Sequence, residues 1–288
     1  MDILLFVYIL STSFIAGIIG SLLGLGGGII LVPALTILFD MPMHEAIGVS
    51  FIGVLVNSSS SSLVYIKNRI TDMRLSSILE LGAVTGSIIG AYTALLIDSN
   101  VLSAVFGVVL GYVAIDMYRK LKKNSEDNNI KSRSDDEREY FDESTNKTIT
   151  YSVIREKEGT ILSIIGGIFS GLLGLGGGAI FVPIMNRIMK VPIKVAIATS
   201  SFMIGVTSLV GALIFFNNGL IDVAIASPII LGIFFGAQIG SRINKVIDKN
   251  PIISGMKATT DMSILVNQGN IPSVIYGPGF IKQAHTVD

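Results

Sequence analysis

The sequence contains no cysteine and no tryptophan, and its only two histidines are His44 and His285. The absence of cysteine excludes disulfides and thiol chemistry, and two histidines argue against a histidine-rich metal site. Basic and acidic residues balance at zero net charge, so no basic patch indicates a nucleic-acid partner. We therefore expect no cofactor, no nucleic-acid partner and no enzymatic activity.

Charge is also scarce, at 15% of the 288 residues against about 25% in a soluble globular protein. Much of it is concentrated in residues 122–158, which leaves long apolar stretches that could not form a soluble surface. The mean hydropathy is +0.69. We predict a multi-pass protein of the cell membrane, embedded in the lipid bilayer. Its first apolar stretch should be retained, because neither a basic flank nor an Ala-x-Ala cleavage site accompanies it.

The most informative feature is an internal repeat. The pentapeptide Gly-Leu-Gly-Gly-Gly at residues 24–28 recurs at 174–178, and alignment at this offset needs no gap over residues 17–100. Thirty of the 84 paired positions are identical, including Asp72 with Asp222. Apolar composition alone would not align prolines, aspartates and glycines, so we interpret the chain as a duplication.

The two copies differ at their ends. The first copy continues into an apolar run at residues 101–118, whereas no run of about 18 apolar residues follows residue 250. The second copy is therefore expected to lack its last span. Four regions result: a first transmembrane repeat (1–121), a charged, solvated and partly disordered cytoplasmic linker (122–158), a truncated second repeat (159–250) and a non-membrane tail (251–288).

Hydropathy and loop charge predict the topology. Candidate spans of about 20 residues lie at 44–66, 75–97, 101–119, 195–216 and 220–242, while segments 3–39 and 160–189 are longer and are broken by the glycine-rich stretch.

Loop charges have opposite signs in the two copies, since Asp40 is equivalent to Lys190. Lysine and arginine favour the cytoplasmic side, so the copies should face opposite ways, which needs an odd number of crossings in each. Three spans plus a hairpin that enters and leaves on one side satisfy this requirement. The alternative is four crossings, with each broken segment crossing once. We predict the hairpin, and hence an all-α polytopic membrane protein of two inverted repeats, as in many secondary transporters.

Each broken segment carries three consecutive glycines that we assign to substrate binding: Gly26, Gly27 and Gly28 in the first copy, and Gly176, Gly177 and Gly178 in the second. Such glycines break a helix and expose backbone N–H groups. A half-helix that starts there points its positive end inward, where an anion can bind. The alternative is that the glycines only allow helices to pack closely.

Polar pairs in the span after each hairpin are further candidates: Asn57 and Ser58 in the first copy, and Thr207 and Ser208 in the second. Amides and hydroxyls can coordinate an oxyanion without a buried charge, or they can simply pack and bond back to helix carbonyls. Glu80 lies within a span and is a candidate for proton coupling, unless it only reaches interfacial water.

The doubled motif at Leu22–Pro33 and Leu172–Pro183, with the prolines, alanines and serines that follow it, resembles the sulfite exporter TauE/SafE family. The resemblance covers residues 1 to about 250. It implies a permease for sulfite, sulfonates or related organic anions. The missing last span departs from the family pattern.

The tail resembles the C-terminal end of zinc deacetylases such as acetylornithine deacetylase, over Thr260–Asp261, Asn270–Gly279 and Ala284–Asp288. This resemblance implies that His285 is a metal ligand. One histidine cannot hold zinc, which needs about four ligands, so we predict no metal site and an inert tail.

Three functions were weighed. The leading hypothesis is a secondary transporter that exports a small anion such as sulfite or an organosulfonate. The second is a truncated, non-transporting membrane protein or scaffold, which could form a homo-oligomer through the groove that the lost span leaves. The third, a membrane-tethered hydrolase built on the tail, is disfavoured by the absence of further ligands.

Overall fold

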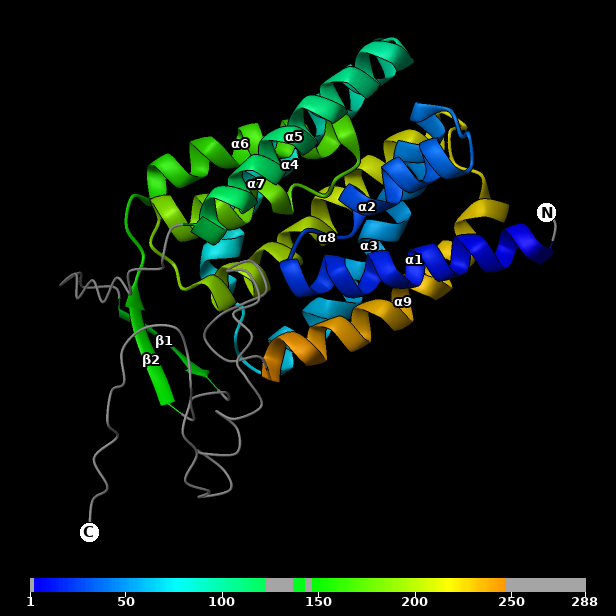
Figure 1. Ribbon diagram of the computed structural model, residues 1–288. Coiled ribbons are helices and arrows are strands. Elements are labelled where there is room, and N and C mark those ends of the chain that lie inside the picture. Colours follow the sequence, from blue (N-terminus) through cyan, green and yellow to red (C-terminus); the bar gives the residue numbers. More distant parts are fainter. Residues whose placement is uncertain (1–2, 123–136, 143–146, 247–288) are drawn as a thin grey trace, which may run out of the picture.

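The computed structural model describes residues 3–122, 137–142 and 147–246. In chain order the elements are α1 (Ile3–Leu23), α2 (Gly28–Pro33), the π-helical turn η1 (Ala34–Leu38), α3 (Met43–Lys67), α4 (Met73–Leu96), α5 (Ser99–Lys122), β1 (Glu137–Asp142), β2 (Lys147–Ser152), α6 (Glu156–Leu173), α7 (Gly178–Pro183), the π-helical turn η2 (Ile184–Ile188), α8 (Ile193–Asn217) and α9 (Val223–Val246) (Figure 1). The helical elements follow the same order on either side of the strands, as the duplication predicts.

Long apolar helices dominate the fold, and α1, α3, α4, α8 and α9 are each long and apolar enough to cross a bilayer. The predicted all-α polytopic membrane fold is therefore confirmed. The predicted loss of the last span from the second copy, and the tail with His285, concern residues that lie outside the described part of the chain.

The broken segments form hairpins. In each copy a long helix, α1 or α6, meets the glycine-rich stretch, and the chain returns as a short helix and a π-helical turn (Figure 1). α1 runs parallel to α9, since Gly232 packs on Leu10 and Gly240 on Ile18. α6 runs parallel to α4 in the same manner, since Gly82 packs on Thr160 and Gly90 on Ile168. Small residues let these helix pairs approach closely, as is common in membranes.

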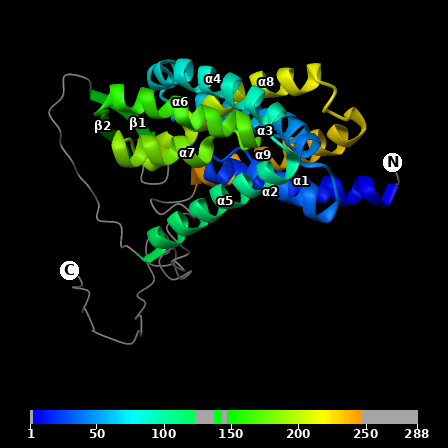
Figure 2. The same ribbon diagram turned by 90° about the horizontal axis from the view of Figure 1, so that it is seen from above.

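The two ends of the helix bundle differ in charge. The α3–α4 loop carries Lys67 and Arg69 and lies at the end where the strands and the η2–α8 loop lie (Figures 1 and 2). Asp40 and Asp222 lie at the opposite end, where His44 joins α3 to the end of α4 and Gly48 packs on Leu220. The positive-inside rule assigns the basic end to the cytoplasm. Asp40 and Lys190 thus lie at opposite ends, which confirms the inverted hairpins and contradicts the four-crossing alternative.

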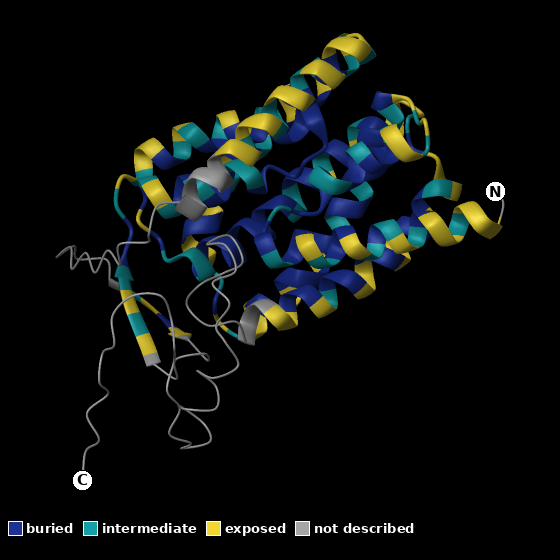
Figure 3. Ribbon diagram, viewed as in Figure 1, coloured by how far each residue is buried: buried dark blue, intermediate teal, exposed yellow. Residues whose placement is uncertain are grey.

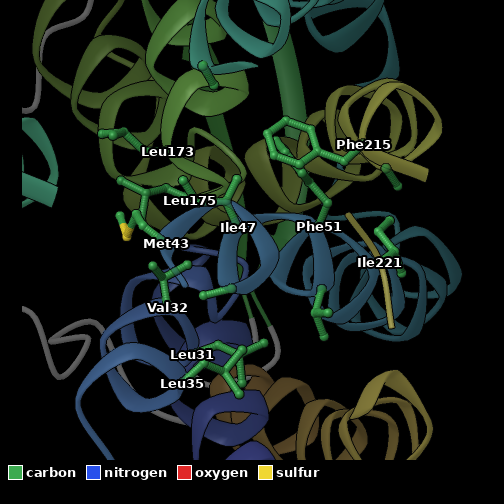
Figure 4. Packing of buried hydrophobic residues seen from close by; sticks show 14 of the residues in the cluster. Leu31, Val32, Leu35, Met43, Ile47, Phe51, Leu173, Leu175, Phe215 and Ile221 are labelled. Carbon is green, nitrogen blue, oxygen red and sulfur yellow. The ribbon is translucent and has the colours of Figure 1, made fainter. Parts of the chain in front are cut away.

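α3 and α8 form the centre of the bundle and are largely buried, whereas α5 is largely exposed (Figure 3). Apolar side chains from both copies meet around α3 (Figure 4). The rings of Phe51 and Phe215 lie 5.3 Å apart at 58°, and Gly211 leaves the space that Phe51 occupies. The core therefore joins the copies, and neither copy has its own.

The composition of residues 122–158 predicts a solvated, partly disordered linker, but part of this segment forms an antiparallel β-hairpin of β1 and β2, here named the linker hairpin. Side chains alternate along both strands, so that Arg138, Tyr140 and Tyr151 face the helix bundle. Arg138 lies 2.6 Å from Asp72 in the α3–α4 loop and 2.9 Å from Glu156 on α6. The linker hairpin thus ties the two copies together at the basic end of the bundle.

Asp72 is the centre of these contacts. Its carboxylate accepts hydrogen bonds from the Tyr151 hydroxyl at 2.9 Å and from the Leu75 N–H, where it caps α4. Its own N–H donates to the Thr199 hydroxyl on α8. Burial and the negative Asp72 carboxylate raise the pKa of Tyr151 above its ordinary value, so its phenol remains a hydrogen-bond donor at neutral pH.

Candidate functional site

Each hairpin turns at a glycine that has a left-handed backbone. Gly27 has φ 82° and precedes α2, and Gly177 has φ 77° and precedes α7. Residues with a Cβ rarely adopt this conformation, which explains the glycines at the helix starts. The first N–H groups of a helix have no partner within it, so both short helices begin with N–H groups that can bind a ligand.

A proline ends each short helix, at Pro33 and Pro183, and a π-helical turn follows directly. Proline has no N–H to bond the preceding turn, so the helix widens at this point. Within this turn the Thr36 hydroxyl donates to the carbonyls of Val32 and Pro33. The returning chain therefore leaves the bundle as a short, interrupted segment rather than as a second full span.

The glycine-rich turns at residues 24–28 and 174–178, here called the tips, lie against each other in the middle of the molecule. A Cβ placed on Gly28 would overlap the Gly174 carbonyl, and one on Gly178 would overlap the Gly24 carbonyl. A predicted glycine of each copy thus packs on the glycine-rich turn of the other copy, Gly28 on Gly174 and Gly178 on Gly24. Close packing also explains Gly28 and Gly178, so the packing alternative accounts for part of the motif.

Two serines, Ser50 and Ser200, hold the tips across the repeat boundary. The Ser50 hydroxyl on α3 donates to the Gly174 carbonyl at 2.9 Å, and the Ser200 hydroxyl on α8 donates to the Gly24 carbonyl at 3.2 Å. Each copy therefore supplies the donor for the other copy's tip. The glycine-rich turn leaves these carbonyls without a helical partner, and the serines satisfy them.

We expect Ser50→Ala and Ser200→Ala each to lower the free energy of unfolding by about 1 kcal/mol, because each leaves a buried carbonyl without its donor. Thermal unfolding of the detergent-extracted protein measures this change. Ser77→Ala is the matched control, since the exposed Ser77 hydroxyl bonds only within its own helix, to Met73. Melting temperatures equal to that of the control would contradict the role of Ser50 and Ser200 in holding the tips.

Asn57 and Ser208 lie near the middle of α3 and α8, beside the tips. Asn57 is 1% exposed, and its amide nitrogen lies 3.3 Å from the place that a Cβ on Gly27 would occupy. Ser208 is fully buried, and its hydroxyl oxygen lies 3.6 Å from the place that a Cβ on Gly176 would occupy. Within the described residues, neither the Asn57 amide nor the Ser208 hydroxyl has a hydrogen-bond partner. Unpaired buried polar atoms are costly, so these two are the strongest candidates to contact a ligand.

Their sequence neighbours have other roles. The Ser58 hydroxyl donates to the Ser201 carbonyl and joins α3 to α8. The Thr207 hydroxyl bonds back to the Met203 and Ile204 carbonyls of its own helix. Both side chains are engaged in helix packing, so the structure favours the packing alternative for Ser58 and Thr207.

Two further groups went unrecognised in the sequence. Ser170 on α6 is buried, its hydroxyl has no partner among the described residues, and its Cβ lies 3.1 Å from a Cβ position on Gly177. His44 bonds the Ala94 and Ile97 carbonyls at the end of α4. Neither residue has an equivalent of the same type in the other copy, so the repeat pattern gave no signal for them.

Comparison with known proteins supports the same assignment. Residues 9–256 match the family model described as sulfite exporter TauE/SafE. The chain is 33% identical to the probable membrane transporter protein YunE of Bacillus subtilis, over 88% of this chain and 93% of the relative. It is 28% identical to the probable membrane transporter protein MJ0441 of Methanocaldococcus jannaschii, over 85% and 88%. No solved structure matches the chain. The resemblance of the tail to zinc deacetylases stays a prediction.

Proposed function

The chain belongs to the sulfite exporter TauE/SafE family of membrane transporters, and we propose that it is a secondary transporter of a small anion such as sulfite or an organosulfonate. One observation carries the proposal. Two opposed helix starts lie beside two buried polar side chains, Asn57 and Ser208, that have no partner among the described residues. Helix starts and neutral donors can hold an anion without a buried positive charge.

The candidate site is Gly26–Gly28 with Asn57 in the first copy, and Gly176–Gly178 with Ser208 in the second. Ser170 adds a hydroxyl beside Gly177. In the described residues of α3 and α8, the charged side chains lie only near the helix ends, so neutral groups alone line the middle of both helices. A site of this composition favours a small anion that sheds water for several N–H and O–H donors.

Inverted repeats provide the transport mechanism that we propose. The bundle has two equivalent ways of opening, one at each end, because each hairpin packs on the other copy's helices. An anion held between the tips would then face one side or the other as one copy tilts against the other. The Ser50 and Ser200 bonds keep the tips together through this motion.

Counterflow in liposomes tests the proposal. The full-length protein is reconstituted, and uptake of labelled sulfite is measured against internal sulfite or methanesulfonate. We expect uptake above that of empty liposomes, with Asn57→Ala and Ser208→Ala raising the KM by about 10- to 100-fold, because each removes a hydrogen bond to a charged ligand.

Asn218→Ala is the matched control for Asn57, since Asn218 lies at an exposed loop and bonds the Ile214 carbonyl. Its KM should equal that of the unaltered protein. No flux of either anion by a monodisperse protein would overturn the proposal and favour a non-transporting scaffold. A KM that Asn57→Ala leaves unchanged would remove Asn57 from the site.

A further inference from the structure

Glu80 is a buried carboxyl group that the proposed binding site does not use. It lies on α4, about two turns from the cytoplasmic start of the helix. Both carboxyl oxygens are buried, and neither has a hydrogen-bond partner within residues 3–122, 137–142 and 147–246. An ionised carboxylate is strongly disfavoured in such surroundings, because no donor among these residues compensates its charge.

The elements around Glu80 offer it no charge partner at its own level. α4 packs on α6 and α8, whose charged residues are Glu156, Lys157 and Glu158 in the first turn of α6 and Lys194 in the first turn of α8. Arg138 of the linker hairpin pairs with Asp72 and Glu156. All of these groups lie at the cytoplasmic end, below the level of Glu80.

The nearby hydroxyls are also engaged elsewhere. Ser163 of α6, which is level with Glu80, donates to the Leu79 and Thr160 carbonyls. The Thr160 hydroxyl donates to the Glu156 carbonyl. The neutral, protonated form of Glu80 is therefore the form that fits this conformation.

The repeat shows that helix packing does not require a carboxyl group here. The position equivalent to Glu80 in the second copy is Ile230, an apolar residue on α9. By contrast, Asp72 and Asp222 both cap the start of a helix. The duplicated fold thus retains its structural aspartates in both copies but has a mid-helix carboxyl group in only one.

We infer that Glu80 is the proton-binding group that couples anion transport to a pH gradient, an inference that rests on the proposed function. Glu80 binds one proton in the conformation described. When the cytoplasmic end opens, water reaches the first turns of α4, and the carboxyl group releases this proton to the cytoplasm. Since conformation and protonation depend on each other, a pH difference across the membrane drives the conformational cycle.

Two liposome measurements with the full-length protein test the inference. Methanesulfonate is the probe, because it stays ionised at any working pH and its own charge does not report the gradient. Counterflow without a gradient measures transport alone, and uptake driven by a pH step measures coupling. We expect Glu80→Gln to keep counterflow within about twofold and to lose gradient-driven uptake by about tenfold or more.

Glu80→Asp retains a titratable group and should restore part of the gradient-driven uptake, which a purely structural role would not predict. Retained counterflow shows that both variants fold. Absence of counterflow in the unaltered protein would overturn the proposed function itself. Normal counterflow with no response to the pH step, or an unchanged response in Glu80→Gln, would overturn the role of Glu80 alone.

Discussion

Replacing Gly178 with alanine is expected to abolish transport and to destabilise the protein. The added Cβ would overlap the Gly24 carbonyl and lie 2.8 Å from the Leu25 Cα, and neither backbone atom can rotate away. Overpacking of this kind costs about 1–3 kcal/mol even where the surroundings relax. Here relaxation would also separate the two tips and weaken the Ser200 bond to Gly24, so anion uptake should fall by about tenfold or more.

Gly107→Ala is the control, because Gly107 is also a helical glycine but has no neighbouring atom within 4 Å of the added Cβ. Alanine is the better helix former, so this variant should be as stable as the unaltered protein or slightly more stable. Uptake in liposomes and thermal unfolding in detergent are measured together. Equal behaviour of the two variants would show that the tips do not meet as described.

Arg138→Ala is expected to have the largest effect of any change in the linker hairpin. Arg138 and Asp72 form a nearly dry ion pair, with side chains 11% and 6% exposed. Removing the cation leaves the buried Asp72 carboxylate with only the neutral donors of Tyr151 and Leu75, and breaking a buried ion pair in this way costs about 3–5 kcal/mol. The melting temperature should fall by about 10 °C, because this loss is large for a chain of this size.

The exposed pair Arg155–Glu158, at 3.7 Å and with side chains 62% and 59% exposed, provides the comparison. Arg155→Ala should change the free energy of unfolding by less than about 1 kcal/mol, as is usual for surface ion pairs. If Arg138→Ala melts at the same temperature as Arg155→Ala, the linker hairpin does not contribute to stability as the contacts indicate.

The spans and the duplication could be predicted from the sequence because both are carried by local signals. Apolar runs mark the helices, and the fixed offset of 150 residues aligns the glycines and aspartates of both copies. Loop charge then predicted the inverted arrangement, since Asp40 and Lys190 occupy equivalent positions with opposite signs. These signals do not depend on how the helices pack.

The hydrogen bonds from Ser50 and Ser200 to the other copy's tip could not be predicted in this way. Ser50 and Gly174 are 124 residues apart, an offset that matches neither the repeat nor any local periodicity. The linker hairpin was missed for a different reason. Its alternating Tyr140, Ile149 and Tyr151 are few and lie among charged residues, so composition indicated a solvated connector.

The serine bonds between the two copies also determine the order in which the chain can complete its structure during synthesis. Gly24 enters the membrane early, but its donor, Ser200, is made 176 residues later. Until α8 arrives, the first tip must leave a polar carbonyl unpaired in an apolar setting, which costs free energy. The nascent first repeat therefore carries an unsatisfied carbonyl at Gly24 until the second repeat supplies Ser200.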